Sequence, residues 1–195
     1  MVGGQHLDFL YRDLGAVAGA IGECRRGEPK SVYQLGHPLG FHNQIYAGEV
    51  ACCRPLFDPH GAVEELKKLV RHYPAGLRRA AVSKHLFDAA FELGIADKPA
   101  AREDILYASG CLFRAAGFMT LVLYGLNCQW FVNEKGAIPA SRKFSIRPRN
   151  FHATIEHVLA APGGDSQSLR QSIRRMKSLW SRLRALAVSR GLVVE

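Results

Sequence analysis

The chain has 195 residues, of which 48% are hydrophobic, and its formal net charge is +9. This composition supports a hydrophobic core and excludes a disordered chain, while the charge favours anionic partners. Five cysteines without a Cys-x-x-Cys motif argue against a disulfide framework or a zinc site, and the first twenty residues lack the pattern of a secretory signal. We therefore expect a cytoplasmic protein.

The chain begins with an alternating pattern. Leu7, Phe9 and Tyr11 occupy every second position, which predicts a strand with one buried face. Asp8 interrupts this apolar run. A carboxylate in such a strand is costly unless it is paired, bound to a metal or directed at a cleft.

The pattern over the next fifty residues is mixed. Residues 12–27 predict a helix that ends at Gly27, with Asp13 in place for an N-cap. Residues 31–50 then predict a strand, a loop and a short helix. Residues 51–61 predict a further short strand that ends in a Pro-Gly turn.

From residue 61 onward the hydrophobic periodicity is helical. It predicts a short helix over 62–74, a longer one over 75–97, and a central apolar helix over about 102–131. A helix over about 149–160 and a last helix capped by Asp165 or Ser166 complete the series. We expect these helices to form a bundle.

The fold class that follows is α+β, mainly α. We predict a small mixed α/β region over residues 1–60 and a helical bundle domain over residues 61–195. Residues 115–133 contain no charged residue, which by length alone would suit a membrane span. Because several amphipathic helices could surround this segment, we predict a buried bundle helix and no membrane partner.

Three polar side chains lie in a glycine-rich stretch. His37, His42 and Tyr46 belong to "GHPLGFHNQIYAGE", which reads as a flexible loop. They could line a polar pocket for a substrate or nucleotide, ligate a metal, or belong to an ordinary surface loop. Two histidines five residues apart, without a third ligand, are weak evidence for a metal site.

A second polar group follows the predicted central helix. Asn133, Glu134 and Lys135 could be the solvated end of that helix, where a lysine complements the helix dipole. Alternatively, the apolar helix delivers these three groups to a cleft that binds a substrate or nucleotide. The sequence leaves both interpretations open.

Arg147 and His152 have an Arg-x4-His spacing that resembles the active motif of HEPN-type ribonucleases. A capping or surface role is the alternative. The last helix is strongly basic, and residues 165–195 contain seven Lys or Arg and two acids. Its apolar stripe explains the helix by itself, so we expect these cations to form a solvated outer face. Nucleic acid is a conceivable partner but is not favoured.

Four stretches occur in an order that resembles a known family. They are "HLDFLYRDL", "YQLGHPLGFHNQIYAGEVACCRPLFDP", "YPAGLRRAAV" and "CLFRAAGFMTLVLYGLNCQWFVNEKGA". In this order they resemble the later part of nucleotidyltransferase-superfamily proteins related to aminoglycoside nucleotidyltransferases. That resemblance implies the remnant of a small mixed-sheet catalytic domain followed by a helical bundle.

The resemblance also implies a chemistry. In that family a Gly-Ser dipeptide holds nucleotide phosphates, an Asp-x-Asp pair binds Mg²⁺, and a third carboxylate on a neighbouring strand completes the site. Asp8 matches the third carboxylate, so the resemblance implies a catalytic and metal-binding role for it. A solvent-facing acid on an edge strand is the alternative interpretation.

The implied partners are a nucleoside triphosphate and a small hydroxyl-bearing acceptor, with nucleoside monophosphate transfer as the reaction. This sequence has no Gly-Ser loop or Asp-x-Asp pair before Asp8. We therefore expect an incomplete or inactive member, and Mg²⁺ binding only if the missing motif is supplied. A strand without its neighbours leaves an open edge, so we also expect a homodimer. A noncatalytic module that binds a nucleotide, RNA or a protein through the basic last helix is the alternative.

Overall fold

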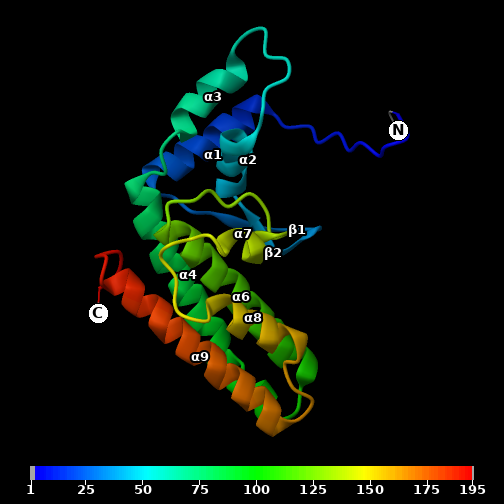
Figure 1. Ribbon diagram of the computed structural model, residues 1–195, viewed down its shortest axis with the longest axis vertical. Helices are drawn as coiled ribbons and strands as arrows, with labels where there is room; N and C mark the ends of the chain where they lie inside the picture. The colour runs from blue at the N-terminus through cyan, green and yellow to red at the C-terminus, as the bar shows by residue number, and fades with distance from the viewer. Residues whose placement is uncertain (1–2, 195) are drawn as a thin grey trace.

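The computed structural model describes residues 3–194 and is mainly helical, with one small two-stranded antiparallel sheet near the N-terminus (Figure 1). This confirms the prediction of a mainly helical protein with a small sheet in its N-terminal part. The elements in chain order are α1 (Leu14–Arg26), β1 (Ser31–Gln34), β2 (His37–His42), α2 (Gln44–Cys52), α3 (Ala62–Val70), α4 (Ala75–Ile95), α5 (Asp97–Ala101), α6 (Ile105–Leu126), α7 (Ala137–Ser141), α8 (Phe151–Ala160) and α9 (Ser166–Val188).

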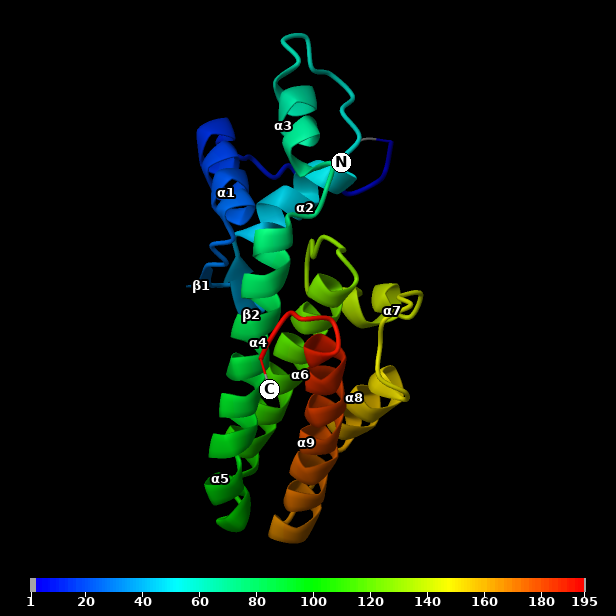
Figure 2. The ribbon, with the colours of Figure 1, turned by 90° about the vertical axis from the view of Figure 1, so that its left-hand side faces the viewer.

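The larger hydrophobic core surrounds α6. The buried side chains of α6 include the consecutive residues Leu121, Val122 and Leu123, which lie on different sides of the helix. They pack with apolar residues of β2, α4, α8 and α9. Figure 2 shows α4, α6, α8 and α9 side by side along the long axis. The predicted central helix of a bundle is thus confirmed.

A smaller core lies at the other end of α4. It joins buried residues of α1, α2 and α3 with Leu77 and Ala81 of α4. Figure 2 shows these three helices stacked beyond the bundle around the first turns of α4. The domain boundary near residue 60 stays a prediction, and this core draws residues from both sides of it.

Local sequence signals decide where several helices begin and end. Asp13 accepts a hydrogen bond from the backbone N–H of Ala16, and Asp165 accepts one from that of Ser168, as expected for N-caps. Gly27 ends α1 in the left-handed conformation. The helices predicted over residues 12–27, 62–74, 75–97 and 149–160 are confirmed, with shifts of a few residues at their ends.

The sheet is a hairpin whose two strands face each other across a two-residue turn. Ser31 pairs with His42 and Gln34 with His37, with an irregularity between Val32 and Gln34. Asn43 fixes the hairpin to the chain that precedes it. Its side-chain oxygen accepts from the N–H of Lys30, and its amide donates to Glu23 and to the carbonyl of Glu28. The stretch predicted as a loop around His37 and His42 is therefore strand β2.

The predicted opening strand is wrong. Residues 6–13 form an extended segment without a ladder partner, and Figure 1 shows it leading away from the helices. Phe9 and Tyr11 are 75% and 89% exposed. An alternating pattern forms a strand only where another strand satisfies its backbone groups, and none of the described strands pairs with this segment.

The predicted short strand over residues 51–61 is also wrong. The helix α2 continues through Cys52, and an irregular loop then leads to α3. The ammonium group of Lys67 donates to the backbone carbonyls of Val50, Ala51 and Cys53 at 3.2, 3.3 and 2.8 Å. A cation at the C-terminal carbonyls stabilises a helix end, so α3 supports the longer α2.

The central helix ends earlier than predicted. It stops at Leu126 instead of near residue 131, because Asn127 ties the chain to another segment. The Asn127 side chain donates to the carbonyl of Ile146 and accepts from its N–H. Cys128 then has a positive φ of 52°, which turns the chain out of the helical path.

By length and hydropathy α6 would also pass as a membrane-spanning helix. Its most apolar window has a mean hydropathy of 1.5, and 56% of that window is buried by the rest of the chain. Such burial is typical of the core helix of a bundle, but it is weak evidence either way. The cytoplasmic location and the lack of a membrane partner stay predictions.

Two helical glycines test the close packing. A Cβ on Gly48 of α2 would lie 2.7 Å from the backbone oxygen of Phe131. We expect Gly48→Ala to lower the free energy of unfolding by ~1–3 kcal/mol, because a backbone contact has little room to yield. Gly110→Ala in α6 is the control, since a Cβ there would meet nothing within 4 Å. Because alanine favours a helix more than glycine does, this substitution should raise the free energy of unfolding by up to ~1 kcal/mol. Urea denaturation measures both, and a Gly48→Ala protein as stable as the native one would contradict the packing.

Candidate functional site

Two of the predicted site residues meet although they lie 97 positions apart in sequence. His37 begins β2, and Glu134 lies in the loop between α6 and α7. The Nδ1 atom of His37 is 3.1 Å from Oε2 of Glu134, and their side chains are 16% and 17% exposed. The ring of Phe41 packs edge-on against the His37 ring at 5.2 Å between centroids. The pair therefore fixes the hairpin to the segment that follows α6.

The second oxygen of Glu134 makes this pair a candidate site. Oε1 is buried and has no hydrogen-bond partner among the described residues. Glu134 lines a cavity of about 100 Å³ whose other walls are mostly apolar and come from β2, α6, α7 and α8. A buried carboxylate oxygen without a partner is costly. It would be satisfied by a hydroxyl or ammonium group, and it could also accept a proton from one.

Asn133 and Lys135 do not share this cavity. The side-chain oxygen of Asn133 accepts a hydrogen bond from the backbone N–H of Lys135 at 3.1 Å. Both residues line a separate depression of about 310 Å³ beside Trp130 and Tyr124. The three consecutive polar residues thus divide, and only Glu134 lines the cavity next to the hairpin.

His42 packs inside the protein. It is 1% exposed, and its Nδ1 is 2.8 Å from the hydroxyl of Ser31. Its ring packs edge-to-face on the ring of His85, which in turn contacts Asp88 through Nδ1 at 3.1 Å. Burial, followed by the neighbouring His85, lowers the pKa of His42 to about 3. His42 is therefore a neutral core histidine at physiological pH.

Tyr46 helps to hold the N-terminal segment. The guanidinium group of Arg12 lies 5.6 Å from the centre of the Tyr46 ring and makes a two-pronged ion pair with Glu49. The Tyr46 ring also packs against Phe41 at 4.9 Å between centroids. Tyr46 thus lies between the hairpin that carries His37 and the end of the extended segment that carries Asp8.

Asp8 itself is exposed in the extended segment, and it makes no hydrogen bond or ion pair with the described residues. Residues 3–194 contain no group of three or more His, Cys, Asp or Glu that could hold a metal ion. Magnesium needs several oxygen ligands in octahedral geometry, and a lone exposed carboxylate does not supply them. The described residues therefore do not fit the implied Mg²⁺ site.

Arg147 and His152, the pair with ribonuclease-like spacing, both line a depression of about 520 Å³. Each is engaged in a local contact: Arg147 donates to the backbone oxygen of Phe144, and His152 is 3.0 Å from the hydroxyl of Ser141. Burial, Arg142 and then Arg147 lower the pKa of His152. His152 is 8% exposed, so this geometry favours a packing role over attack on an RNA strand.

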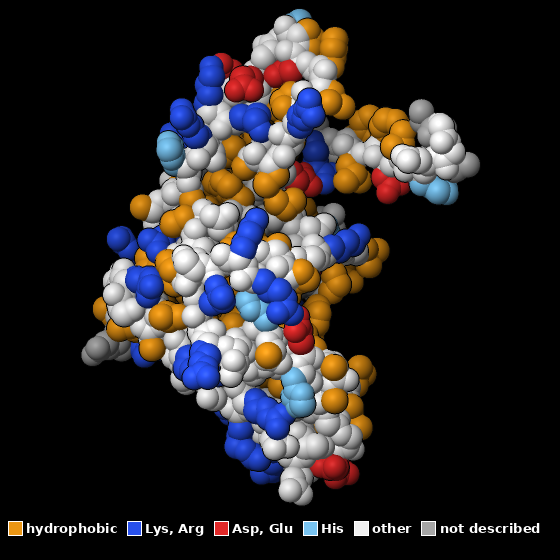
Figure 3. Space-filling model, viewed as in Figure 1, with side chains coloured by type: hydrophobic (Ala, Val, Ile, Leu, Met, Phe, Trp, Pro, Cys, Tyr) orange, Lys and Arg blue, Asp and Glu red, His pale blue; other side chains and the backbone are white. Residues whose placement is uncertain are grey.

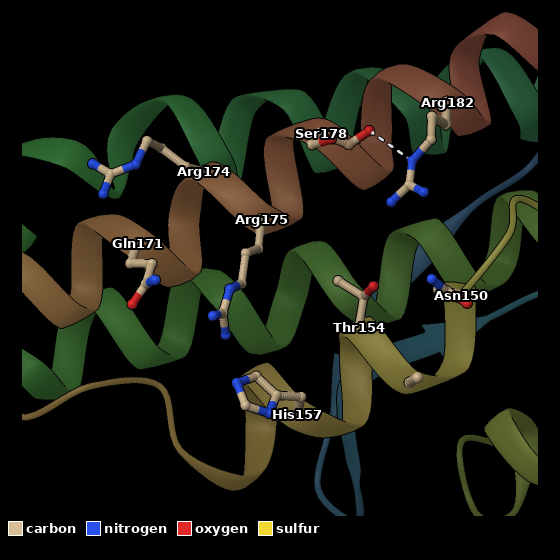
Figure 4. A pocket seen from close by; sticks show the side chains of 9 residues that line it. Asn150, Thr154, His157, Gln171, Arg174, Arg175, Ser178 and Arg182 are labelled. Atoms are coloured by element: carbon tan, nitrogen blue, oxygen red, sulfur yellow. Dashed lines mark hydrogen bonds between the residues drawn. The ribbon is translucent and has the colours of Figure 1, made fainter.

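Sequence reasoning missed a basic groove of about 750 Å³ between α8 and α9. Figure 4 shows Arg175 and Arg182 extending from α9 toward α8, where His157 and Asn150 face them. Spacings of three and four residues along both helices place these groups on facing sides. That signal was present in the sequence, but only the packing of α8 on α9 brings the two rows together.

The buried histidines predict an acid-sensitive fold. Above about pH 6.5 His42 is neutral in both the folded and the unfolded chain, and below it only the unfolded chain binds the proton. The free energy of unfolding should therefore fall as the pH is lowered toward 3, by ~1.4 kcal/mol per pH unit. Burial likewise lowers the pKa of His85.

The measurement is urea denaturation at pH 7 and pH 5. We expect His42→Gln to lose part of the difference between the two pH values, whereas the exposed His72→Gln keeps it. An equal pH dependence in both variants would show that His42 is protonated inside the folded protein.

The comparisons with known proteins found no match: no protein-family model, no curated protein and no solved structure matches the chain. The family resemblance noted from the sequence thus remains a prediction. Any function for the chain has to be argued from its own residues, and the contact between His37 and Glu134 is the most specific of these.

Proposed function

We propose that this chain is the acceptor-binding part of a nucleotidyltransferase-like protein. In this proposal Glu134 receives a hydrogen bond from a hydroxyl or amino group of a small polyhydroxylated acceptor. The observation that carries the proposal is the carboxylate of Glu134, with Oε2 held by His37 and Oε1 buried and without a partner among the described residues, beside a cavity. A carboxylate oriented in this way is suited to position or deprotonate an acceptor hydroxyl.

Two further features support the proposal. His37 and Glu134 belong to two of the four stretches that carry the family resemblance, and these stretches meet in space. The cavity of about 100 Å³ has room for one substituent of an acceptor and not for a nucleotide. The rest of the acceptor would then contact the protein surface around the mouth of the cavity.

Phosphoryl chemistry is not assigned to the described residues, because they do not fit a magnesium site. A two-metal transfer requires several carboxylates around the nucleotide phosphates. In this proposal Asp8 would act only together with a Gly-Ser loop and an Asp-x-Asp pair that this sequence lacks. We therefore expect no nucleotide transfer by this chain alone.

Glu134→Gln tests the proposed acceptor site. Equilibrium dialysis against a panel of labelled amino sugars and polyols should find a ligand, and the substitution should weaken its binding about 10- to 100-fold. That range corresponds to the loss of one hydrogen bond to a charged group, about 1.5–3 kcal/mol. Glu156→Gln is the matched control, because Glu156 pairs with Arg142 on the exposed face of α8.

Two results would contradict the proposal. One is equal binding by the native and Glu134→Gln proteins, and the other is no binding by the native protein to any member of the panel. Thermal unfolding of each variant separates a lost ligand contact from a lost fold.

We further propose that the chain forms a homodimer through its N-terminal segment. Leu7, Phe9, Leu10 and Tyr11 are all at least half exposed. An apolar cluster of this kind is normally covered by a partner, and a two-fold pair covers two copies at once. The ion pair between Arg12 and Glu49 fixes the end of this segment to the body of the protein.

Sedimentation over a concentration series tests the dimer. We expect a species heavier than the 21.5 kDa monomer, and we expect Phe9→Glu to dissociate it. Phe57→Glu serves as the control, because Phe57 is 86% exposed in the loop before α3 and lies outside the N-terminal segment. A native monomer at high concentration, or equal dissociation by both substitutions, would refute the interface.

A further inference from the structure

The basic groove between α8 and α9 has cations without acidic partners. Arg174, Arg175 and Arg182 line it, and no Asp or Glu among the described residues does. The helix α9 contains no acidic residue, and the one acid of α8, Glu156, pairs with Arg142. Figure 3 shows Lys and Arg side chains spread over this face with few acids among them. The cations thus line a shallow, open depression on the protein surface that holds no acidic partner.

The groove is partly preorganised. Arg182 donates from Nη1 to the backbone oxygen of Arg149 at 3.1 Å and from Nε to that of Ser178, so its guanidinium spans the groove. Arg174 and Arg175 have no hydrogen bond or ion pair within the part of the chain that the structure describes. Eight residues of helix separate Arg174 from Arg182, which is ~12 Å of rise. These donors can contact more than one anionic group of an extended ligand.

The opposite wall adds neutral polar groups. Asn150, Thr154 and His157 of α8 face Arg175 and Arg182, and Gln171 and Ser178 lie beside them on α9 (Figure 4). Such side chains donate to phosphate oxygens and exchange hydrogen bonds with ribose hydroxyls. Arginine forks match phosphate geometry in pairs of hydrogen bonds. The groove therefore combines phosphate donors with groups that can contact a sugar.

We propose that this groove binds the backbone of double-helical RNA through its phosphates and 2′-hydroxyls. No Phe, Tyr or Trp among residues 3–194 lines the groove, and His157 is its one aromatic ring, so it lacks the row of aromatic platforms on which successive unstacked bases of single strands are held. Ala153 is the one apolar residue in the described lining, which leaves no pocket for the anchors of a protein partner. A lining with one small apolar residue also offers no side chain to insert into a bilayer.

The adjoining depression extends the same surface. It shares Asn150 and Ala153 with the groove and adds Arg142, Arg147 and Arg149. Binding would be independent of base sequence, because phosphates and 2′-hydroxyls are present at every nucleotide whatever its base. The groove has no lining residue in common with the proposed acceptor site, which uses the other side of α8.

The test is fluorescence anisotropy of a labelled 20-base-pair RNA duplex, titrated with the full chain over a salt series. We expect binding that weakens steeply with salt, and weaker binding to the DNA duplex of the same sequence, which lacks the 2′-hydroxyls. The R174A/R175A/R182A variant should bind at least tenfold more weakly. The logarithm of the binding constant falls linearly with the logarithm of the salt concentration, and each phosphate contact contributes ~0.9 to the steepness of this line. In the variant the line should therefore be less steep by between two and three.

The control variant is R25A/R79A/R102A, which removes three arginines outside the groove. It loses the same net charge and should bind within about twofold of the native protein. Removing Arg182 also removes its hydrogen bond to the backbone oxygen of Arg149, which could disturb the local fold. The variant R174A/R175A, which keeps Arg182, is therefore measured as well, and R25A/R102A is its control of equal charge. Equal losses in the groove and control variants, equal affinity for RNA and DNA, or no binding at low salt would each overturn the proposal.

Discussion

The packing of α4 against α6 is the constraint on which the other elements depend. Gly125 lets the two helices approach, since a Cβ there would lie 2.9 Å from Val82. Two polar contacts fix their relative position: Arg114 of α6 pairs with Glu92 of α4 at 2.6 Å, and Arg78 of α4 donates to the backbone oxygen of Leu126. With α6 held in this way, its remaining surface becomes the floor on which the hairpin, α8 and α9 pack.

The hairpin reaches its position through the same helix. Leu39 of β2 sits on Gly117 of α6 so closely that a Cβ on this glycine would lie 2.5 Å from the leucine side chain. That contact brings the start of β2 to the segment that leaves α6, where Glu134 meets His37. The candidate acceptor site is therefore a consequence of helix packing in the bundle and of the early end of α6 at Asn127.

Local chemistry explains which parts of this fold could be predicted from the sequence. Asp13 and Asp165 cap helices by contacts within four residues, and apolar spacings identified the buried faces of α4 and α9. The failures involve partners far along the chain. Residues 7–11 have the strand pattern but no pairing strand among the described residues, and α2 extends because Lys67 caps it from another helix. The contact between His37 and Glu134 spans 97 positions. Each residue was a site candidate because of its local sequence, but no local pattern pairs the two.

The two proposed sites share one structural element. Ile155 and Leu159 of α8 close the cavity beside Glu134, whereas Thr154 and His157 of the same helix form a wall of the basic groove. These pairs lie on different faces of α8 because residues three or four apart share a side and neighbours do not. A ligand in the groove that shifts α8 would change the shape of the cavity, and by linkage an acceptor in the cavity would change affinity for the groove by the same factor. Such coupling would pass through Ile155 and Leu159, the two aliphatic side chains by which α8 borders the cavity.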